Sequence, residues 1–252
     1  MNPCRYKLRL AAFSVLASFT VCAMFAQEGE LDKSPPKGTT ADEVIQKFTA
    51  KEKEWKKVRE QYTFQQEIKV QTLDRDQVIG DYRQVADISY KDGKRVKTIV
   101  LAPQASLKLS PEDEEDLESR SSFTISSDEL AIYNVTYIGQ QKLDELHCYA
   151  FDVAPKQMEK GKRYFQGRIW VDDRDLQIVK NTGKSVPDIR IVKKKKTKEN
   201  LFPQFSTWRQ QIDGKYWFPV FSSADDRLHF VTGDVHLKQV VKLTNYKKAE
   251  SK

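Results

Sequence analysis

The sequence has few of the residues on which many disulfide-rich or redox-active exported proteins depend. Its 252 residues include three cysteines, and two of them, Cys4 and Cys22, lie within the first 26 residues. If that segment is removed, Cys148 stands alone, which excludes an intramolecular disulfide in the remaining chain. A lone cysteine in a strand pattern is usually a small buried apolar residue, so we expect no redox or nucleophilic role for it.

The common enzyme motifs are absent as well. The chain has no histidine pair at helical spacing, no Gly-x-Ser-x-Gly and no Walker phosphate loop. His229 and His236 lie in adjacent strand segments, where nearby acids could complete a metal site, but surface histidines explain the pattern as well. Dispersed carboxylates could form a hydrolytic pair, and no pair stands out. We therefore expect no catalytic residues, no metal and no cofactor.

A long apolar run occurs only at the N-terminus. Arg5, Lys7 and Arg9 precede an apolar stretch from Leu10 to Phe25, and the sequence then turns abruptly polar. This pattern predicts a cleaved secretory signal peptide over residues 1–26. A retained membrane anchor is the alternative, but the run is short for a spanning helix. The expected location of the mature protein is the periplasm.

The basic excess of the chain is modest and partly local. The whole chain has a formal net charge of +7, and loss of the signal peptide removes three cations and no acid, which leaves +4. Part of the excess comes from a run of lysines, which reads as a solvated loop or as a contact with lipid headgroups or an acidic partner. Basic residues do not alternate with aromatics along one face, so we expect no nucleic acid partner. The run contains Lys193, Lys194, Lys195 and Lys196.

The clearest helix begins after a polar leader at residues 27–39. Thr40 and Glu43 form a capping box, and apolar residues then recur every three or four positions to about Gln61. Because the helix precedes a long series of strands, we expect it to lie across a sheet. Residues 40–248 contain no internal linker, which predicts a single domain.

Strands dominate the rest of the chain. Short segments of alternating apolar and polar residues are separated by turn signals, and Ser110-Pro111-Glu112 begins a short acidic helix. We expect a loop from Gly183 to Pro203 and a turn at Asp225-Asp226. Most neighbouring strands are joined by hairpins, which indicates a mainly β (α+β) fold built on an antiparallel sheet.

The hairpin over residues 164–180 has the strongest alternation. Phe165, Ile169 and Val171 point to one face, which we expect to be the inner one, and Arg168 and Trp170 point to the other. An acidic turn separates its two strands. The hairpin contains no nucleophile with an adjacent base.

This hairpin resembles a segment of exported bacterial proteins called outer-membrane lipoprotein-sorting proteins, of the LolA/LolB-like lipoprotein carrier superfamily. The similar residues are Phe165 to Asp172 (FQGRIWVD) and Leu176 to Lys180 (LQIVK), and the later strand–turn–strand Trp208 to Pro219 (WRQQIDGKYWFP) is similar too. The signal peptide, the first helix and the strand at Phe64 follow in the matching order.

The resemblance implies a curved sheet or half-barrel of about 11 antiparallel strands, with the N-terminal amphipathic helix and short helices as a lid over a hydrophobic cavity. It implies a monomeric, non-enzymatic carrier of lipid or lipoprotein acyl chains that contacts envelope membranes or membrane proteins. The candidate cavity residues are Val44, Ile45, Phe48, Phe64, Ile68, Phe151, Phe165, Ile169, Val171, Phe218 and Leu237. The alternative is an envelope protein-interaction or sensor module of the same fold with a filled core.

Overall fold

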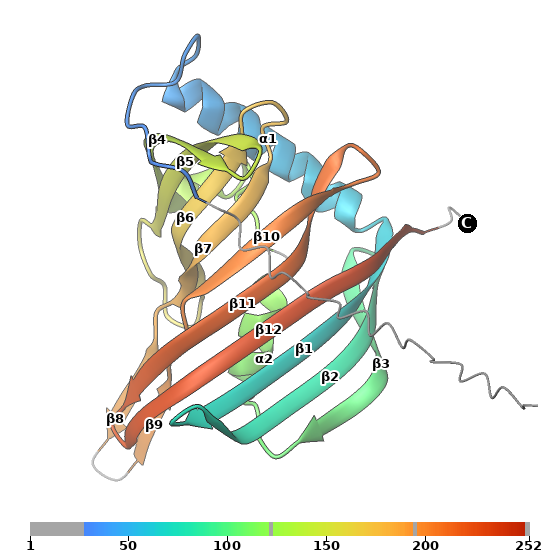
Figure 1. The fold of residues 1–252 in the computed structure, drawn as a ribbon, viewed down its shortest axis with the longest axis vertical. Helices are drawn as coiled ribbons and strands as arrows, with labels where there is room; N and C mark the ends of the chain where they lie inside the picture. Colours follow the sequence, from blue (N-terminus) through green and yellow to red (C-terminus); the bar gives the residue numbers. More distant parts are fainter. Residues whose placement is uncertain (1–27, 121–122, 194–195, 250–252) are drawn as a thin grey trace, which may run out of the picture.

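The structure is a computed structural model that describes residues 28–120, 123–193 and 196–249 (Figure 1). The expected signal peptide lies outside these residues. The described chain is mainly β, as predicted, with one ten-stranded antiparallel sheet in the order β3-β2-β1-β12-β11-β10-β7-β6-β5-β4. The sheet is curved and is not closed into a barrel, and β3 and β4 form its two edges.

The strands of this sheet are long and follow one another mostly through tight turns. They are β1 (Tyr62–Asp74), β2 (Gln77–Lys91), β3 (Lys94–Ala105), β4 (Tyr133–Leu143), β5 (Leu146–Pro155), β6 (Tyr164–Asp172), β7 (Ile178–Val186), β10 (Phe205–Ile212), β11 (Tyr216–Phe230) and β12 (Gly233–Lys248). The last strand, β12, returns to pair with β1, so the first and last strands of the chain are neighbours in the middle of the sheet.

The hairpin formed by β6 and β7 has the predicted orientation. Phe165, Ile169 and Val171 belong to the largest buried apolar cluster, on the face that the helices cover. Arg168 and Trp170 lie on the opposite face, where Arg168 Nε donates to Asp152 at 2.8 Å. Alternation therefore assigned the faces of this hairpin correctly, because side chains in a strand project with a period of two.

Helix α1 (Ala41–Arg59) crosses one end of the sheet (Figure 1). Its capping box is present: Thr40 Oγ1 accepts from the Glu43 N–H, and the Glu43 carboxylate accepts from the Thr40 N–H. Val44, Phe48 and Trp55 are buried on the side that faces the sheet. An apolar stripe of this kind fixes an amphipathic helix on a sheet because its burial removes apolar area from water.

Helix α2 (Pro111–Arg120) lies farther along the same face, behind β11 and β12 in Figure 1. A short 3₁₀ turn, η1 (Leu130–Ile132), precedes β4. No helix in the described part of the chain is both long and apolar enough to cross a bilayer.

Two sequence expectations about loops are wrong. The expected loop from Gly183 to Pro203 instead holds the end of β7 and a separate hairpin, β8 (Ile189–Lys193) and β9 (Lys196–Asn200). The lysine run obscures a strand pattern in the sequence, because Lys193 and Lys196 themselves belong to the paired strands β8 and β9. The strands therefore number twelve in the described residues, against the expected eleven.

The expected turn at Asp225-Asp226 is also wrong, because β11 runs through both residues and turns at Val231. Asp225 is opposite Lys238 in β12, and its carboxylate accepts from Lys238 and His236 at 3.2 and 2.6 Å. Asp225 thus takes part in a cross-strand charge pairing, which stabilises a strand rather than a turn.

Part of the leader at residues 27–39, which the sequence indicates to be flexible, lies along the edge strand β4. The Gly29 N–H donates to the Lys142 carbonyl, and the Asp32 N–H donates to the Gln140 carbonyl, both at 2.8 Å. Leu31 packs against the small apolar cluster on the outer face, which includes Trp170. This segment covers an edge that would otherwise expose unpaired backbone groups.

Candidate functional site

An apolar pocket of 260 Å³ lies between α2, β9 and strands β1, β11 and β12. We call it the α2 pocket. Its apolar wall comes from segments far apart in the sequence, and polar side chains of α2 and β9 form its rim. The apolar lining consists of Val70, Leu107, Leu109, Leu201, Pro203, Leu228, Phe230, Val235 and Leu237.

Strand alternation and register bring the floor of the pocket together. In β11, Leu228 and Phe230 alternate with charged or polar neighbours, and in β12, Val235 and Leu237 do the same. Leu228 is directly opposite Val235 across the β11–β12 pair, and Leu237 is opposite Thr72 of β1. Residues opposite one another in an antiparallel pair share a face, so these side chains form one continuous apolar surface.

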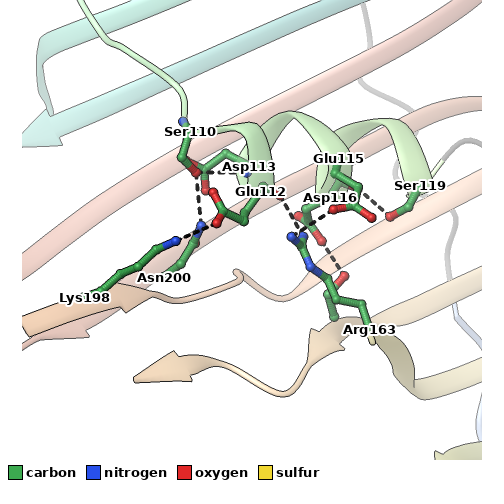
Figure 2. Close-up of polar contacts among 10 residues, drawn as sticks. Ser110, Glu112, Asp113, Glu115, Asp116, Ser119, Arg163, Lys198 and Asn200 are labelled. Atoms are coloured by element: carbon green, nitrogen blue, oxygen red, sulfur yellow. Dashed lines mark hydrogen bonds and ion pairs between the residues drawn. The ribbon is translucent and has the colours of Figure 1, made fainter. Parts of the chain in front are cut away.

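Polar contacts at its N-terminus hold α2 over this surface (Figure 2). Ser110 Oγ accepts from the Asp113 N–H at 3.2 Å, in the manner of a helix cap. From β9, Lys198 Nζ lies 2.7 Å from Glu112 Oε1, and Asn200 Nδ2 donates to Ser110 Oγ at 3.1 Å. The hydrogen bond from Lys198 lowers the pKa of the Glu112 carboxyl.

Arg163 ties the middle of α2 to the start of β6. Its Nη1 donates to the Glu112 carbonyl at 2.7 Å, and its Nη2 lies 3.2 Å from Glu115 Oε2 (Figure 2). The guanidinium also stacks 4.4 Å from the ring centroid of Phe202. The side chains of Lys198 and Glu115 are largely exposed, and ion pairs in such positions contribute little to stability because water screens them.

The buried side of α2 is mostly polar. Leu117 is its one fully buried apolar residue, and it packs in a cluster with Phe64, Ile68 and Val70 of the sheet. Beside it, Asp116 pairs with Arg120 at 2.5 Å and accepts a short hydrogen bond from Ser185. The helix therefore rests on little apolar area.

The candidate cavity residues from the sequence are all at least partly buried, but they fall into separate clusters. Phe64, Ile68 and Leu237 belong to the cluster around Leu117, and Leu237 also lines the α2 pocket. Phe218 packs with Trp55 and Tyr62. The remaining members form one cluster between α1 and the sheet, with Val44, Ile45 and Phe48 from the helix and Phe151, Phe165, Ile169 and Val171 from the strands.

A buried ionic network between α1 and the sheet was not anticipated. Arg209 Nη1 lies 3.1 Å from both carboxylate oxygens of Glu52, and Thr124 Oγ1 donates to Glu52 at 2.6 Å. Arg209 Nη2 also donates to the Phe123 carbonyl at 2.6 Å. A signal existed in the sequence, because Glu52 interrupts the apolar stripe of α1 between Phe48 and Trp55.

Strand β9 of the β8–β9 hairpin contributes Lys198, Glu199 and Asn200 to the lining of the α2 pocket. Lys193 and Lys196 pair in register, while Lys194 and Lys195 lie outside the described residues. Glu199 of β9 accepts from the Val231 N–H at 2.8 Å, which joins the hairpin to the β11–β12 turn. The side chains of Ile191 and Val231 are 46% and 70% exposed, so this end of the molecule presents apolar groups to solvent.

The titratable residues that the sequence singled out are engaged in ordinary contacts. His229 Nδ1 lies 2.8 Å from Asp234, and His236 Nε2 lies 2.6 Å from Asp225, so the two histidines pair with different acids. Cys148 is buried, and burial raises the pKa of its thiol to about 12. The thiolate needed for nucleophilic or redox chemistry is therefore scarce at neutral pH.

A second hollow lies on the outer face of the sheet, and it is polar in character. It has a volume of 770 Å³, and its wall includes Asp152, Arg168 and Lys184. Lys180 is buried there between the rings of Trp170 and Trp208, at 4.9 and 5.2 Å from their centroids, and it pairs with Glu28. Acyl chains would gain less in this groove than in the α2 pocket, because few apolar groups line it.

No family model and no curated protein matches the chain. The solved structures that are similar to it include the following three. A DUF1329 family protein from Desulfovibrio piger is 13% identical, covers 82% of this chain and 92% of its own, and has a TM-score of 0.40. A LolA superfamily protein from Nitrosomonas europaea is 13% identical, with 85% and 96% covered and a TM-score of 0.35.

The third is an outer membrane lipoprotein-sorting protein domain from Vibrio parahaemolyticus, 10% identical, with 79% and 91% covered and a TM-score of 0.38. Two of the three names match the family that the sequence motifs resemble. At these TM-scores the matches support no conclusion about the function of this chain.

Proposed function

We propose that the protein is a non-enzymatic periplasmic carrier that binds acyl chains of a lipid or lipoprotein in the α2 pocket. The observation that supports this is an apolar floor covered by a helix that is attached mainly by polar contacts. Burial of an acyl chain releases about 0.8 kcal/mol per methylene. A pocket of 260 Å³ lies just below the usual range of ligand sites, so it holds part of one chain.

Movement of α2 would enlarge the site. Leu117 covers Phe64 and Ile68, so displacement of the helix extends the floor from Leu237 to both of these predicted cavity residues. The cost is modest because the ties at the rim are exposed ion pairs and hydrogen bonds. Segments that open to admit ligands are usually the least stably attached parts of a fold.

The resemblance implied a lid made of the N-terminal helix and the short helices, and a lipid-facing role for the seven predicted cavity residues on and beneath α1 depends on movement of α1. In this structure α1 is the more firmly held helix, because it buries Phe48 and Trp55 and pairs Glu52 with Arg209. We therefore assign the gating movement to α2 and treat the cluster beneath α1 as the fixed part of the site.

The hairpin of β8 and β9 is suited to contact with headgroups. Lys108 and Lys198 line the pocket rim. Of the predicted contact residues, Lys193 and Lys196 belong to the β8–β9 hairpin, and Lys194 and Lys195 lie outside the described residues. Exposed Ile191 and Val231 lie at the same end of the molecule. Cationic and apolar side chains together favour an anionic bilayer surface as the place where cargo is exchanged.

The direct test is titration of a fluorescent fatty acid. We expect saturable binding to the wild-type protein and at least tenfold weaker binding to Leu109→Trp, because the indole fills the pocket. Ile132→Trp, at a position that is 43% exposed in η1, is the matched control and should bind like the wild type. Failure of the wild type to bind, or equal binding by Leu109→Trp, would contradict the proposal.

A second candidate function is an envelope protein-interaction module. Edge strand β3 supports it, because Val96, Ile99 and Val100 are exposed on a strand that has one free side in the sheet. An extended partner segment could add to this edge through backbone hydrogen bonds. Loss of a specific envelope partner from Ile99→Lys, with fatty acid binding absent from the wild type, would favour this function.

A further inference from the structure

A third pocket lies between the C-terminal halves of α1 and α2. Its volume is 310 Å³, and strands β4, β6, β7 and β10 complete its wall. We call it the Arg120 pocket. Four cationic side chains line it, Lys56, Arg59, Arg120 and Arg163, against the one carboxylate of Glu129. This excess of positive charge distinguishes the Arg120 pocket from the rest of the sheet face that the helices cover.

Arg120 is the centre of the pocket. Its side chain is 0% exposed, and its Nη2 pairs with Asp116 at 2.5 Å. Its Nε and Nη1 have no hydrogen-bond partner among the residues that the structure describes. A guanidinium has five N–H groups, and buried donors are almost always paired in native proteins, so this arrangement calls for an acceptor.

The surrounding charges leave Arg120 only partly compensated. Asp116 divides its carboxylate between Arg120 and Ser185, and Glu129 is engaged by Lys56 at 2.8 Å. Burial lowers the pKa of Arg120 despite the neighbouring carboxylate of Asp116. An added negative charge would therefore be stabilised at this position.

Aromatic rings form another part of the wall. The Arg120 guanidinium lies 4.4 Å from the ring centroid of Phe205, and the rings of Phe123 and Phe165 are 4.2 Å apart. All three rings line the pocket. Such a wall accepts an apolar body attached to an anionic group.

The geometry points to an organic oxyanion as the ligand of this pocket, with a carboxylate or phosphate held by Arg120 and an apolar body packed on Phe123 and Phe165. Arginine suits both groups because its planar fork donates two parallel hydrogen bonds. This site is separate from the α2 pocket and does not depend on the proposed carrier function. The two are neighbours, since Asp116 lines one and Arg120 the other.

The test compares three probes by calorimetry: octyl phosphate, inorganic phosphate and octanol. We expect octyl phosphate to bind and octanol to bind at least tenfold more weakly. If inorganic phosphate binds as tightly as octyl phosphate, the ligand is the free oxyanion. If inorganic phosphate binds more weakly than octyl phosphate, the ligand is an amphiphile such as a lipid. Either result supports a site for oxyanions, whereas equal binding of octyl phosphate and octanol would overturn it.

Variants locate the binding site. Arg120→Gln should weaken octyl phosphate binding at least tenfold, and Leu109→Trp, which blocks the α2 pocket, should leave it unchanged. Because Arg120→Gln can disturb folding, Lys56→Gln with Arg59→Gln is a second variant, with Lys47→Gln on the exposed side of α1 as its control. We expect weaker binding by the double variant and not by the control. Loss of binding in Leu109→Trp alone would assign the anion to the α2 pocket and overturn the inference.

Discussion

Helices α1 and α2 cover the same face of the sheet but are attached to it in different ways. Helix α1 buries Val44, Phe48 and Trp55, whereas α2 buries the single apolar residue Leu117. Apolar burial is the dominant favourable term in folding, at about 25 cal/mol per Å². The difference supports the proposal that α1 belongs to the stable core and that α2 is the helix that moves.

The buried ion pairs of the two helices also differ, because one joins its helix to the sheet and the other lies within its helix. Glu52 of α1 pairs with Arg209 of β10 and accepts from the Ile178 N–H of β7, so its contacts cross to the sheet. Asp116 and Arg120 are four residues apart within α2, so their pairing survives if the helix moves as a unit. The pair itself therefore does not fix α2 in place, and the contacts that link it to the sheet are the hydrogen bond from Ser185 of β7 to Asp116 and the packing of Arg120 on Phe205 of β10.

The largest effect on the free energy of unfolding is expected when a buried side chain of α1 is shortened. Phe48 is fully buried and lies 5.4 Å from the ring of Phe151. We expect Phe48→Ala to lower the free energy of unfolding by about 4 kcal/mol, through lost burial and a residual cavity. Urea unfolding measures this change. A loss below about 1 kcal/mol would show that α1 is only loosely attached.

Loss of the cross-sheet ion pair should be nearly as costly. Arg209→Met leaves the Glu52 carboxylate buried without its partner, and we expect the free energy of unfolding to fall by about 3 kcal/mol. The double variant with Glu52→Gln should recover part of that loss, because no buried charge remains. Urea unfolding of both variants tests this, and an unaffected single variant would contradict the role given to the network.

A smaller, pH-dependent effect should come from Glu129, where α1 meets η1. Burial raises the pKa of its carboxyl, but hydrogen bonds from Lys56 and Ser126 outweigh burial, so the net pKa is below the ordinary 4.5. A carboxyl with a lowered pKa stabilises the fold above its unfolded value and loses that contribution in acid.

Glu129→Gln should therefore be less stable than the wild type at pH 7, by under about 1 kcal/mol because the pair is partly exposed. The difference should shrink as pH falls through 4.5 and below. Unfolding midpoints at pH 7 and pH 4 test this, with Glu145→Gln in the β4–β5 turn as a control for loss of one charge. A difference that grows in acid would contradict the assignment.

The smallest effect on stability should come from the rim of the α2 pocket. Lys198 is 59% exposed, so Lys198→Ala should change the free energy of unfolding by no more than about 0.5 kcal/mol. The same variant should accelerate fatty acid uptake, since it removes the tie to Glu112. Stopped-flow fluorescence measures the rate, and Lys47→Ala on α1 is the control. Unchanged uptake would place the gate elsewhere.

The fold was predictable from the sequence where local patterns agree with tertiary structure. The capping box at Thr40 located the start of α1, and alternation assigned the faces of the β6–β7 hairpin. The strand through Asp225 was missed because its stability comes from charges in β12. Local turn statistics contain no information about such partners.

The sites were less predictable for a similar reason. Leu237 was identified as a cavity residue, but the wall it belongs to combines Leu109, Leu201 and Leu228, which only the register and the placement of α2 bring together. Arg120 reads as a favourable charge at the C-terminus of a helix. Its burial depends on Phe205, which is distant in sequence.

Native-state hydrogen exchange with and without a fatty acid tests the central comparison most directly. The account predicts that amide protons of α2 exchange through local opening while those of α1 exchange only with global unfolding, and that dodecanoate slows exchange in α2 and not in α1. Faster exchange in α1 than in α2, or protection by dodecanoate that is confined to α1, would contradict it and would restore α1 as the lid.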